Sequence, residues 1–145
     1  MMARQVILND IEATLGIVPG FMEGMADMIL EHTWSFLKDF LMIDTALSAK
    51  TKALIGIGSA STLRCDYWVP FLAGLAQLGG ASDEEIAEAI TVASGVARDS
   101  VYLNGIAYDQ ATFMGELAQV AEHVQSGDEH CQSQRLGSSV ISLQI

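Results

Sequence analysis

Apolar side chains recur at helical spacing along most of this chain. Between residues 23 and 43 one stripe repeats at that spacing and can face a neighbour: Met25, Ile29, Phe36, Phe40 and Ile43. A second stripe follows a predicted helix start near residue 82: Ile86, Ile90, Ala93 and Ala97. A repeat of about 3.6 residues is typical of amphipathic helices. The pattern therefore predicts an all-α fold, a compact multi-helix bundle.

Glycine, proline and serine mark the ends of the first predicted helices. A helix over residues 3–15 is broken by a glycine and a Pro-Gly pair, which leave a loop from Leu15 to Phe21. The long helix of the first stripe follows and ends in a turn. Ser48 closes this turn and is placed to cap a helix from Ala49 to about Leu63.

The later helix boundaries carry clearer signals. Asp66 can cap a helix over residues 67–78, and two glycines after it end that helix. Ser82 followed by Glu85 is a capping box, in which the side chain of each residue accepts a hydrogen bond from the backbone N–H group of the other residue. We expect this boundary to be the sharpest in the chain.

A length of 145 residues suits one domain. The last helical stretch, interrupted or not near residues 98–100, extends towards Val124. Beyond it Ser, Gly, Gln, Asp and Glu dominate the sequence. The prediction is a helical domain over residues 1–124 and a flexible tail over residues 125–145.

Composition and charge limit the kinds of molecule that this protein is expected to bind. Half of the residues are apolar and the mean hydropathy is +0.33, so one small subunit would leave apolar surface exposed, and self-association would cover it. A net charge of −11 repels nucleic acids and anionic lipid surfaces.

The run from Ala53 to Leu63 is too short to span a membrane, and the N-terminus lacks a signal-peptide pattern. We expect a cytoplasmic homo-oligomer with no nucleic-acid or membrane partner.

Two cysteines, Cys65 and Cys131, are too few for a disulfide scaffold. Cys65 follows Arg64 and precedes a predicted helix start, and both the cation and the unpaired N–H groups favour thiolate. A buried Cys that packs as a small hydrophobic residue is the alternative. No metal or cofactor is expected, because the Glu and His residues near positions 122 and 129 lack zinc-ligand spacing.

Three segments carry a resemblance to a known family: Leu47–Ile55, Arg64–Tyr67 and Gly80–Ile90. In order and spacing they resemble the core of the alkyl hydroperoxidase D-like (carboxymuconolactone decarboxylase) family, and the likeness covers roughly residues 15–110. The resemblance implies an all-helical fold and a trimer or a dimer of trimers. It also implies thiol-dependent peroxide reduction, with a thiol reductant as co-substrate.

The catalytic motif of this family is degenerate here. Redox-active members have a Glu in the helix before the thiol, then Cys-x-x-Cys, then a His four residues later. On this chain those positions hold, in order: Ala53, Cys65, Trp68 and Leu72. Cys65 would correspond to the resolving thiol rather than to the peroxide-attacking one. The loss of the His also removes a group on which the decarboxylase branch relies.

Several readings of the remaining candidates stay open. Trp68 and Leu72 can line an apolar pocket beside Cys65 or belong to ordinary core. His32 lies on the first apolar stripe, as a core or interface residue or as a catalytic one. Cys131 can act as a substitute resolving thiol.

Three functions follow from these readings. The first is a thiol-dependent peroxide-reducing enzyme, impaired because one motif Cys remains. The second is a non-catalytic helical homo-oligomer that binds a small hydrophobic ligand. The third is a small-molecule lyase that uses groups such as Arg98, Tyr102 or His32.

Overall fold

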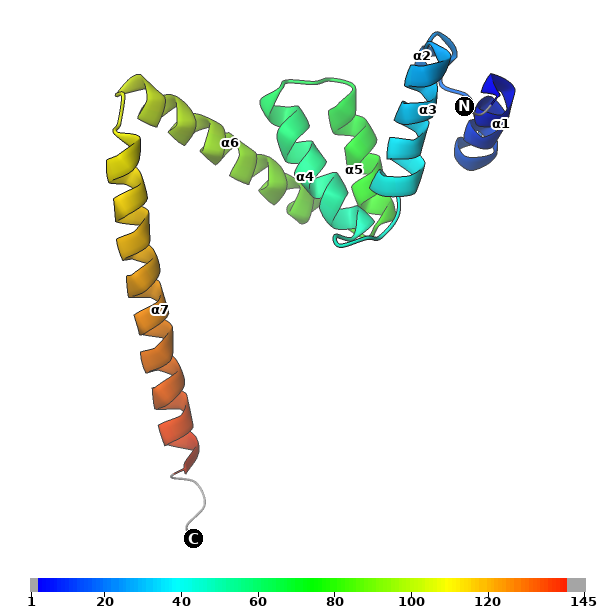
Figure 1. Cartoon of the computed structure of the whole chain (residues 1–145). Helices are drawn as coiled ribbons and strands as arrows, with labels where there is room; N and C mark the ends of the chain where they lie inside the picture. The colour runs from blue at the N-terminus through cyan, green and yellow to red at the C-terminus, as the bar shows by residue number, and fades with distance from the viewer. Residues whose placement is uncertain (1–2, 141–145) are drawn as a thin grey trace. The chain divides into compact units, whose positions relative to one another are not determined.

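The computed structural model describes residues 3–140, and the side chains of residues 3–125. Within this range the chain forms α-helices and one π-helical segment, and no strand (Figure 1). The predicted all-α fold is confirmed. Two compact units, Met1–Arg98 and Asp99–Ile145, divide the chain. Each unit is described by itself.

The first unit contains most of the helices. They are α1 (Arg4–Leu15), α2 (Gly20–Glu23), α3 (Asp27–Ser35), the π-helix η1 (Phe36–Leu41), α4 (Ala49–Thr62), α5 (Trp68–Leu78) and the start of α6 (Asp83–Gly105). The predicted first helix is confirmed, and the loop after it is shorter than expected because α2 begins at Gly20. Ser48 caps α4 as predicted, with its Oγ accepting a hydrogen bond from Thr51 N at 3.1 Å.

The helix predicted over residues 23–43 is shorter than expected, and a different face of it packs against the core. It begins at Asp27, and its last turns are π-helical, with Met42 N donating to Leu37 O at 2.9 Å. The side chains that face the core are Leu30, Trp34, Leu37 and Leu41. Of the predicted stripe, Ile29, Phe36 and Phe40 lie on another face of this helix and are 48–50% exposed. Ile43 lies beyond the end of η1, and Met25 lies before α3 and packs against the core. This helix has two apolar faces, and the core uses the one that the pattern analysis did not select.

Helices α4 and α5 form a tightly packed antiparallel hairpin (Figure 1). Ile57 of α4 is fully buried, and Leu72 and Ala76 of α5 lie in the same core cluster. Gly56 allows a close approach between the two helices. A Cβ atom at this position would lie 2.9 Å from Leu72 Cδ1 and 3.2 Å from Leu72 Cδ2.

Replacing Gly56 by alanine is therefore expected to lower the free energy of unfolding by about 1–3 kcal/mol, the usual cost of overpacking. Leu72 is only 3% exposed, so it has little room to move aside. Gly74→Ala is the matched control, because nothing lies within 4 Å of its added methyl. This variant should gain about 0.5–1 kcal/mol from helix propensity. Urea unfolding followed by circular dichroism measures both, and equal effects of the two substitutions would contradict the packing argument.

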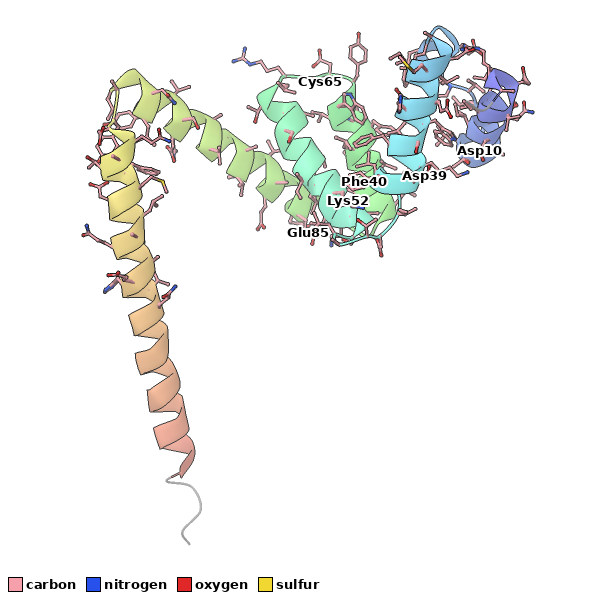
Figure 2. The ribbon with its side chains drawn as sticks, in the orientation of Figure 1. Asp10, Asp39, Phe40, Lys52, Cys65 and Glu85 are labelled. Atoms are coloured by element: carbon pink, nitrogen blue, oxygen red, sulfur yellow. The ribbon has the colours of Figure 1, made fainter. Side chains whose placement is uncertain are left out.

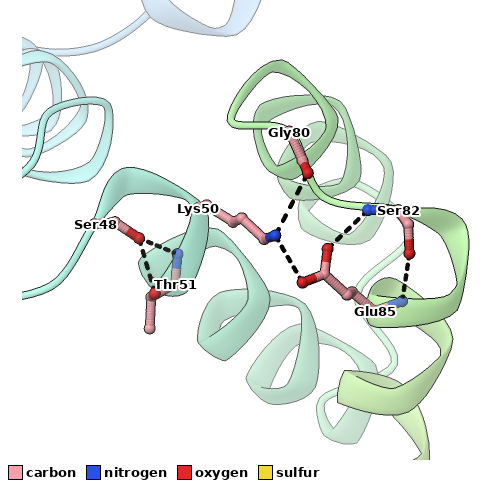
Figure 3. Close-up of polar contacts among 6 residues, drawn as sticks. All are labelled: Ser48, Lys50, Thr51, Gly80, Ser82 and Glu85. Carbon is pink, nitrogen blue, oxygen red and sulfur yellow. Dashed lines mark hydrogen bonds and ion pairs between the residues drawn. The ribbon is translucent and has the colours of Figure 1, made fainter.

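A polar cluster joins the start of α4 to the turn before α6 (Figure 3). Ser82 N donates to Glu85 Oε2 at 2.9 Å and Glu85 N donates to Ser82 Oγ at 3.2 Å, which confirms the predicted capping box. Lys50 Nζ lies 2.6 Å from Glu85 Oε1 and donates to Gly80 O at 3.4 Å. The hydrogen bond from Lys50, followed by that from Ser82 N, lowers the pKa of Glu85. The cluster ties three successive helices together at one end.

The second unit holds the end of α6 and helix α7 (Gln110–Val140). Helix α6 runs without a break through residues 98–100, so the interruption left open there does not occur. The chain turns instead at residues 106–109, and Asp109 caps α7 by accepting from Thr112 N at 2.8 Å. Helix α7 continues past Val124. The flexible tail predicted from Gln125 stays a prediction, because the side chains from residue 126 lie outside those described.

None of the helices in residues 3–140 combines the length and apolarity that a membrane span requires.

Candidate functional site

Cys65 lies in the short turn that joins α4 to α5 (Figure 2). Helix α4 ends in a Schellman motif, in which Cys65 N donates to Ala60 O at 3.0 Å and Arg64 N donates to Ser61 O at 3.1 Å. The motif needs a left-handed residue, and Arg64 occupies that place with φ 53°. The end of α5 repeats the motif with a glycine, Gly80, at φ 82°. Arg64 thus holds a conformation that an L side chain rarely adopts.

Arg64→Gly is expected to raise the free energy of unfolding by about 1 kcal/mol, because glycine adopts the left-handed conformation without the steric penalty of a Cβ atom. Arg64→Ala is the control, since alanine removes the charge and keeps the penalty. Urea unfolding at neutral pH measures both variants. The explanation fails if Arg64→Gly is no more stable than Arg64→Ala.

The Cys65 thiol faces the first turn of α5. Trp68 N lies 3.5 Å from Cys65 Sγ and donates to it, and the side chain is partly buried against the core cluster. The expected cap at Asp66 is wrong: α5 begins after Tyr67, and no side-chain oxygen caps it. This sulfur therefore lies at the N-terminus of a helix and accepts a hydrogen bond from its backbone. The structure therefore gives Cys65 one feature of a reactive thiol.

The other motif positions are filled by apolar packing. Ala53 is 1% exposed and Leu72 is 3% exposed, and both belong to the core of the first unit. Trp68 is not part of this core: it is 40% exposed and meets Phe71 edge to face, with ring centroids 5.5 Å apart. Leu72 is ordinary core, and Trp68 is a surface aromatic residue.

His32 lies at the surface, so its reading as a core residue is wrong. It lines a groove of about 440 Å³ between α1 and the α3–η1 helix. Asp10 of α1 lines the same groove and accepts hydrogen bonds from Lys38 Nζ at 2.7 Å and from Trp34 Nε1 at 2.7 Å. These bonds, that of Lys38 first, lower the pKa of Asp10. The groove does not include Cys65.

Lys52 is a buried charged residue that the sequence analysis did not single out. It is 6% exposed, and its Nζ donates to Phe40 O at 2.7 Å and to Ile43 O at 3.0 Å. The same atom lies 4.3 Å from the centroid of the Phe40 ring (Figure 2). Lys52 thereby satisfies the carbonyls at the end of η1. In the sequence, Lys52 stands next to Ala53 inside a predicted helix, and this position was the signal that could have indicated a buried lysine.

Among the residues with described side chains, no group of three His, Cys, Asp or Glu side chains is arranged to hold a metal ion. Cys131 falls outside those residues, so its role as a substitute resolving thiol stays a prediction.

Comparison with known proteins gives one match. The family model described as the carboxymuconolactone decarboxylase family matches residues 25–109, which is more than half of the chain. The matched segment runs from just before α3 to the turn before α7 and includes the turn that carries Cys65. No curated protein and no solved structure matches the chain.

Proposed function

This chain belongs to the carboxymuconolactone decarboxylase family, and we propose that it is a thiol-dependent peroxide-reducing member of the family in which Cys65 alone carries the chemistry. The observation that carries the proposal is the hydrogen bond from Trp68 N to Cys65 Sγ at 3.5 Å, at the start of α5. The exposed Arg64 adds a neighbouring cation. A cysteine sulfur is the nucleophile in such reactions.

The proposed reaction has an oxidative and a reductive half. The Cys65 thiolate attacks one oxygen of an organic hydroperoxide, so that an S–O bond forms and the O–O bond breaks. The alcohol leaves after taking a proton from water, and Cys65 becomes a sulfenic acid. A small thiol then displaces water to form a mixed disulfide, and a second thiol releases Cys65 and carries away the disulfide.

The replaced positions predict slow turnover. In the redox-active pattern a carboxylate and an imidazole relay protons, whereas Ala53 and Leu72 offer neither group. General acid–base catalysis of this kind contributes about 10²–10⁴-fold to enzymatic rates. An external thiol must also replace the second Cys of the motif, because Trp68 stands there.

A non-catalytic helical homo-oligomer that binds a small hydrophobic ligand is the second candidate. It is favoured by the burial of Ala53 and Leu72, since the core has closed over positions that the chemistry would need. In this reading Cys65 is a small apolar residue at a helix end.

Reaction with a titrated organic hydroperoxide separates the two candidates. Oxidation of each cysteine is followed by mass spectrometry, and peroxide loss is assayed with excess dithiothreitol. We expect oxidation at Cys65, turnover that is lost in Cys65→Ser, and turnover that is kept in the control Cys131→Ser. If Cys65 stays reduced while the peroxide persists, the redox proposal is wrong and the non-catalytic one stands.

A further inference from the structure

Helix α1 has few of the local features that stabilise a helix in water. Its N-cap is Ala3, whose side chain cannot accept a hydrogen bond from the first turn. Arg4 lies in the first turn and Glu12 in the last, and both charges oppose the helix macrodipole. An isolated helix as short as α1, with 12 residues, is marginal even for favourable sequences. The helical form of α1 therefore depends on what the segment contacts.

Two polar contacts hold α1 to the helix that follows α2. At the start of α1, Arg4 Nη1 lies 2.8 Å from Asp27 Oδ1. In its second half, Asp10 (Figure 2) accepts hydrogen bonds from Lys38 Nζ and from Trp34 Nε1, each at 2.7 Å. We call these contacts the Arg4 clasp and the Asp10 clasp. The four side chains of the two ion pairs are 32–56% exposed, so water competes for both clasps.

Apolar contacts add to the clasps on one side of α1 only. Ile7 and Ile11 are buried in the core cluster, whereas the other side chains of α1 are half-buried or exposed. The helix packs against α3, where Trp34 is 4% exposed. By comparison, α4 alone contributes four buried side chains and packs tightly along α5. A segment with few buried contacts opens at a lower free energy than the core of the same domain.

We propose that α1 is a strap whose folding is coupled to its docking on α3. It opens as a unit, losing its helix and both clasps together, while α4 and α5 stay folded. Opening uncovers the side of α3 that carries Trp34, whose indole N–H is covered by Asp10 in the closed strap. Helix α1 lies before residues 25–109, the segment that the family model matches, so the strap does not depend on the chemistry at Cys65.

Hydrogen exchange followed by mass spectrometry tests the strap on the full chain at neutral pH. The amides of α1 should exchange faster than those of α4 in the original protein. Asp10→Asn removes the charge of the Asp10 clasp and should speed exchange in α1 about tenfold, while exchange in α4 is unchanged. Lys50→Met breaks the ion pair with Glu85 instead and is the control, which should leave exchange in α1 unchanged. Equal exchange in α1 and α4, or an equal increase in both with Asp10→Asn, would overturn the proposal.

An added N-cap separates coupled folding from the release of a preformed helix. With Trp68→Phe as background only Trp34 emits, and Asp10→Asn should raise its quenching by acrylamide. Adding Ala3→Ser supplies the missing cap and should lower the open population about fivefold, because a cap stabilises the helix and not the open segment. Ala3→Val lacks the acceptor and is the control. If Ala3→Ser does not reduce the quenching, or if Ala3→Val reduces it equally, α1 leaves α3 as a preformed helix and the coupling is wrong.

Discussion

Ala53→Glu is expected to lower the free energy of unfolding by about 3–5 kcal/mol, the range for an uncompensated charge in a protein interior. Ala53 is 1% exposed and packs in the core between α4 and its neighbours. A glutamate there has neither water nor a cationic partner. Ile55→Glu is the matched control, because it introduces the same residue two positions later on an exposed face and should leave stability nearly unchanged. Urea unfolding followed by circular dichroism compares the two variants.

The opposite outcome of this experiment would be informative. If Ala53→Glu folds with unchanged stability, the core of the first unit has room for a carboxylate. The family's relay position would then be recoverable, and the variant should oxidise Cys65 faster than the original chain.

Lys52→Met is expected to cost about 2–4 kcal/mol of stability, because hydrogen bonds to charged groups contribute about 1.5–3 kcal/mol each and two part-buried carbonyls lose their donor. Methionine keeps the length of the side chain and removes the donors to Phe40 O and Ile43 O. The contact between the ammonium and the Phe40 ring is lost as well.

Lys50→Met is the control for this variant. Lys50 lies two residues earlier in α4 and pairs with Glu85 near the surface, so its loss should be much smaller. Thermal unfolding of the two variants at one pH gives the comparison. Equal shifts of the two transition midpoints would mean that water replaces Lys52 as the hydrogen-bond donor to the carbonyls at the end of η1. Lys52 would then stabilise the fold no more than Lys50 does.

Local signals predicted the helix boundaries best. Ser48 and the pair Ser82 and Glu85 cap helices in the structure as their types and spacing indicate, because a cap depends on atoms within three residues. The cap predicted at Asp66 was wrong for an equally local reason. Arg64 adopts a left-handed conformation, which residue type does not indicate, and this turns Cys65 rather than Asp66 towards α5.

Long-range features were beyond the reach of the pattern. Apolar residues line both the exposed face (Ile29, Phe36, Phe40) and the buried face of α3–η1, so periodicity could not decide which face the core uses. The hydrogen bonds of Lys52 join α4 to carbonyls nine and twelve residues earlier, and they depend on how η1 ends. The motif positions could be located by resemblance, but the burial of Ala53 and Leu72 required the packed structure.

The close contact between Gly56 and Leu72 bears on how this chain could change in evolution. A histidine at position 72 would give up the core contacts that Leu72 makes, and a glutamate at position 53 would place a carboxylate in the core, where Ala53 is 1% exposed. Either step alone passes through a less stable protein, because neither polar group has its partner until both are present. We therefore expect single substitutions to be a costly route to a polar pair at these two core positions.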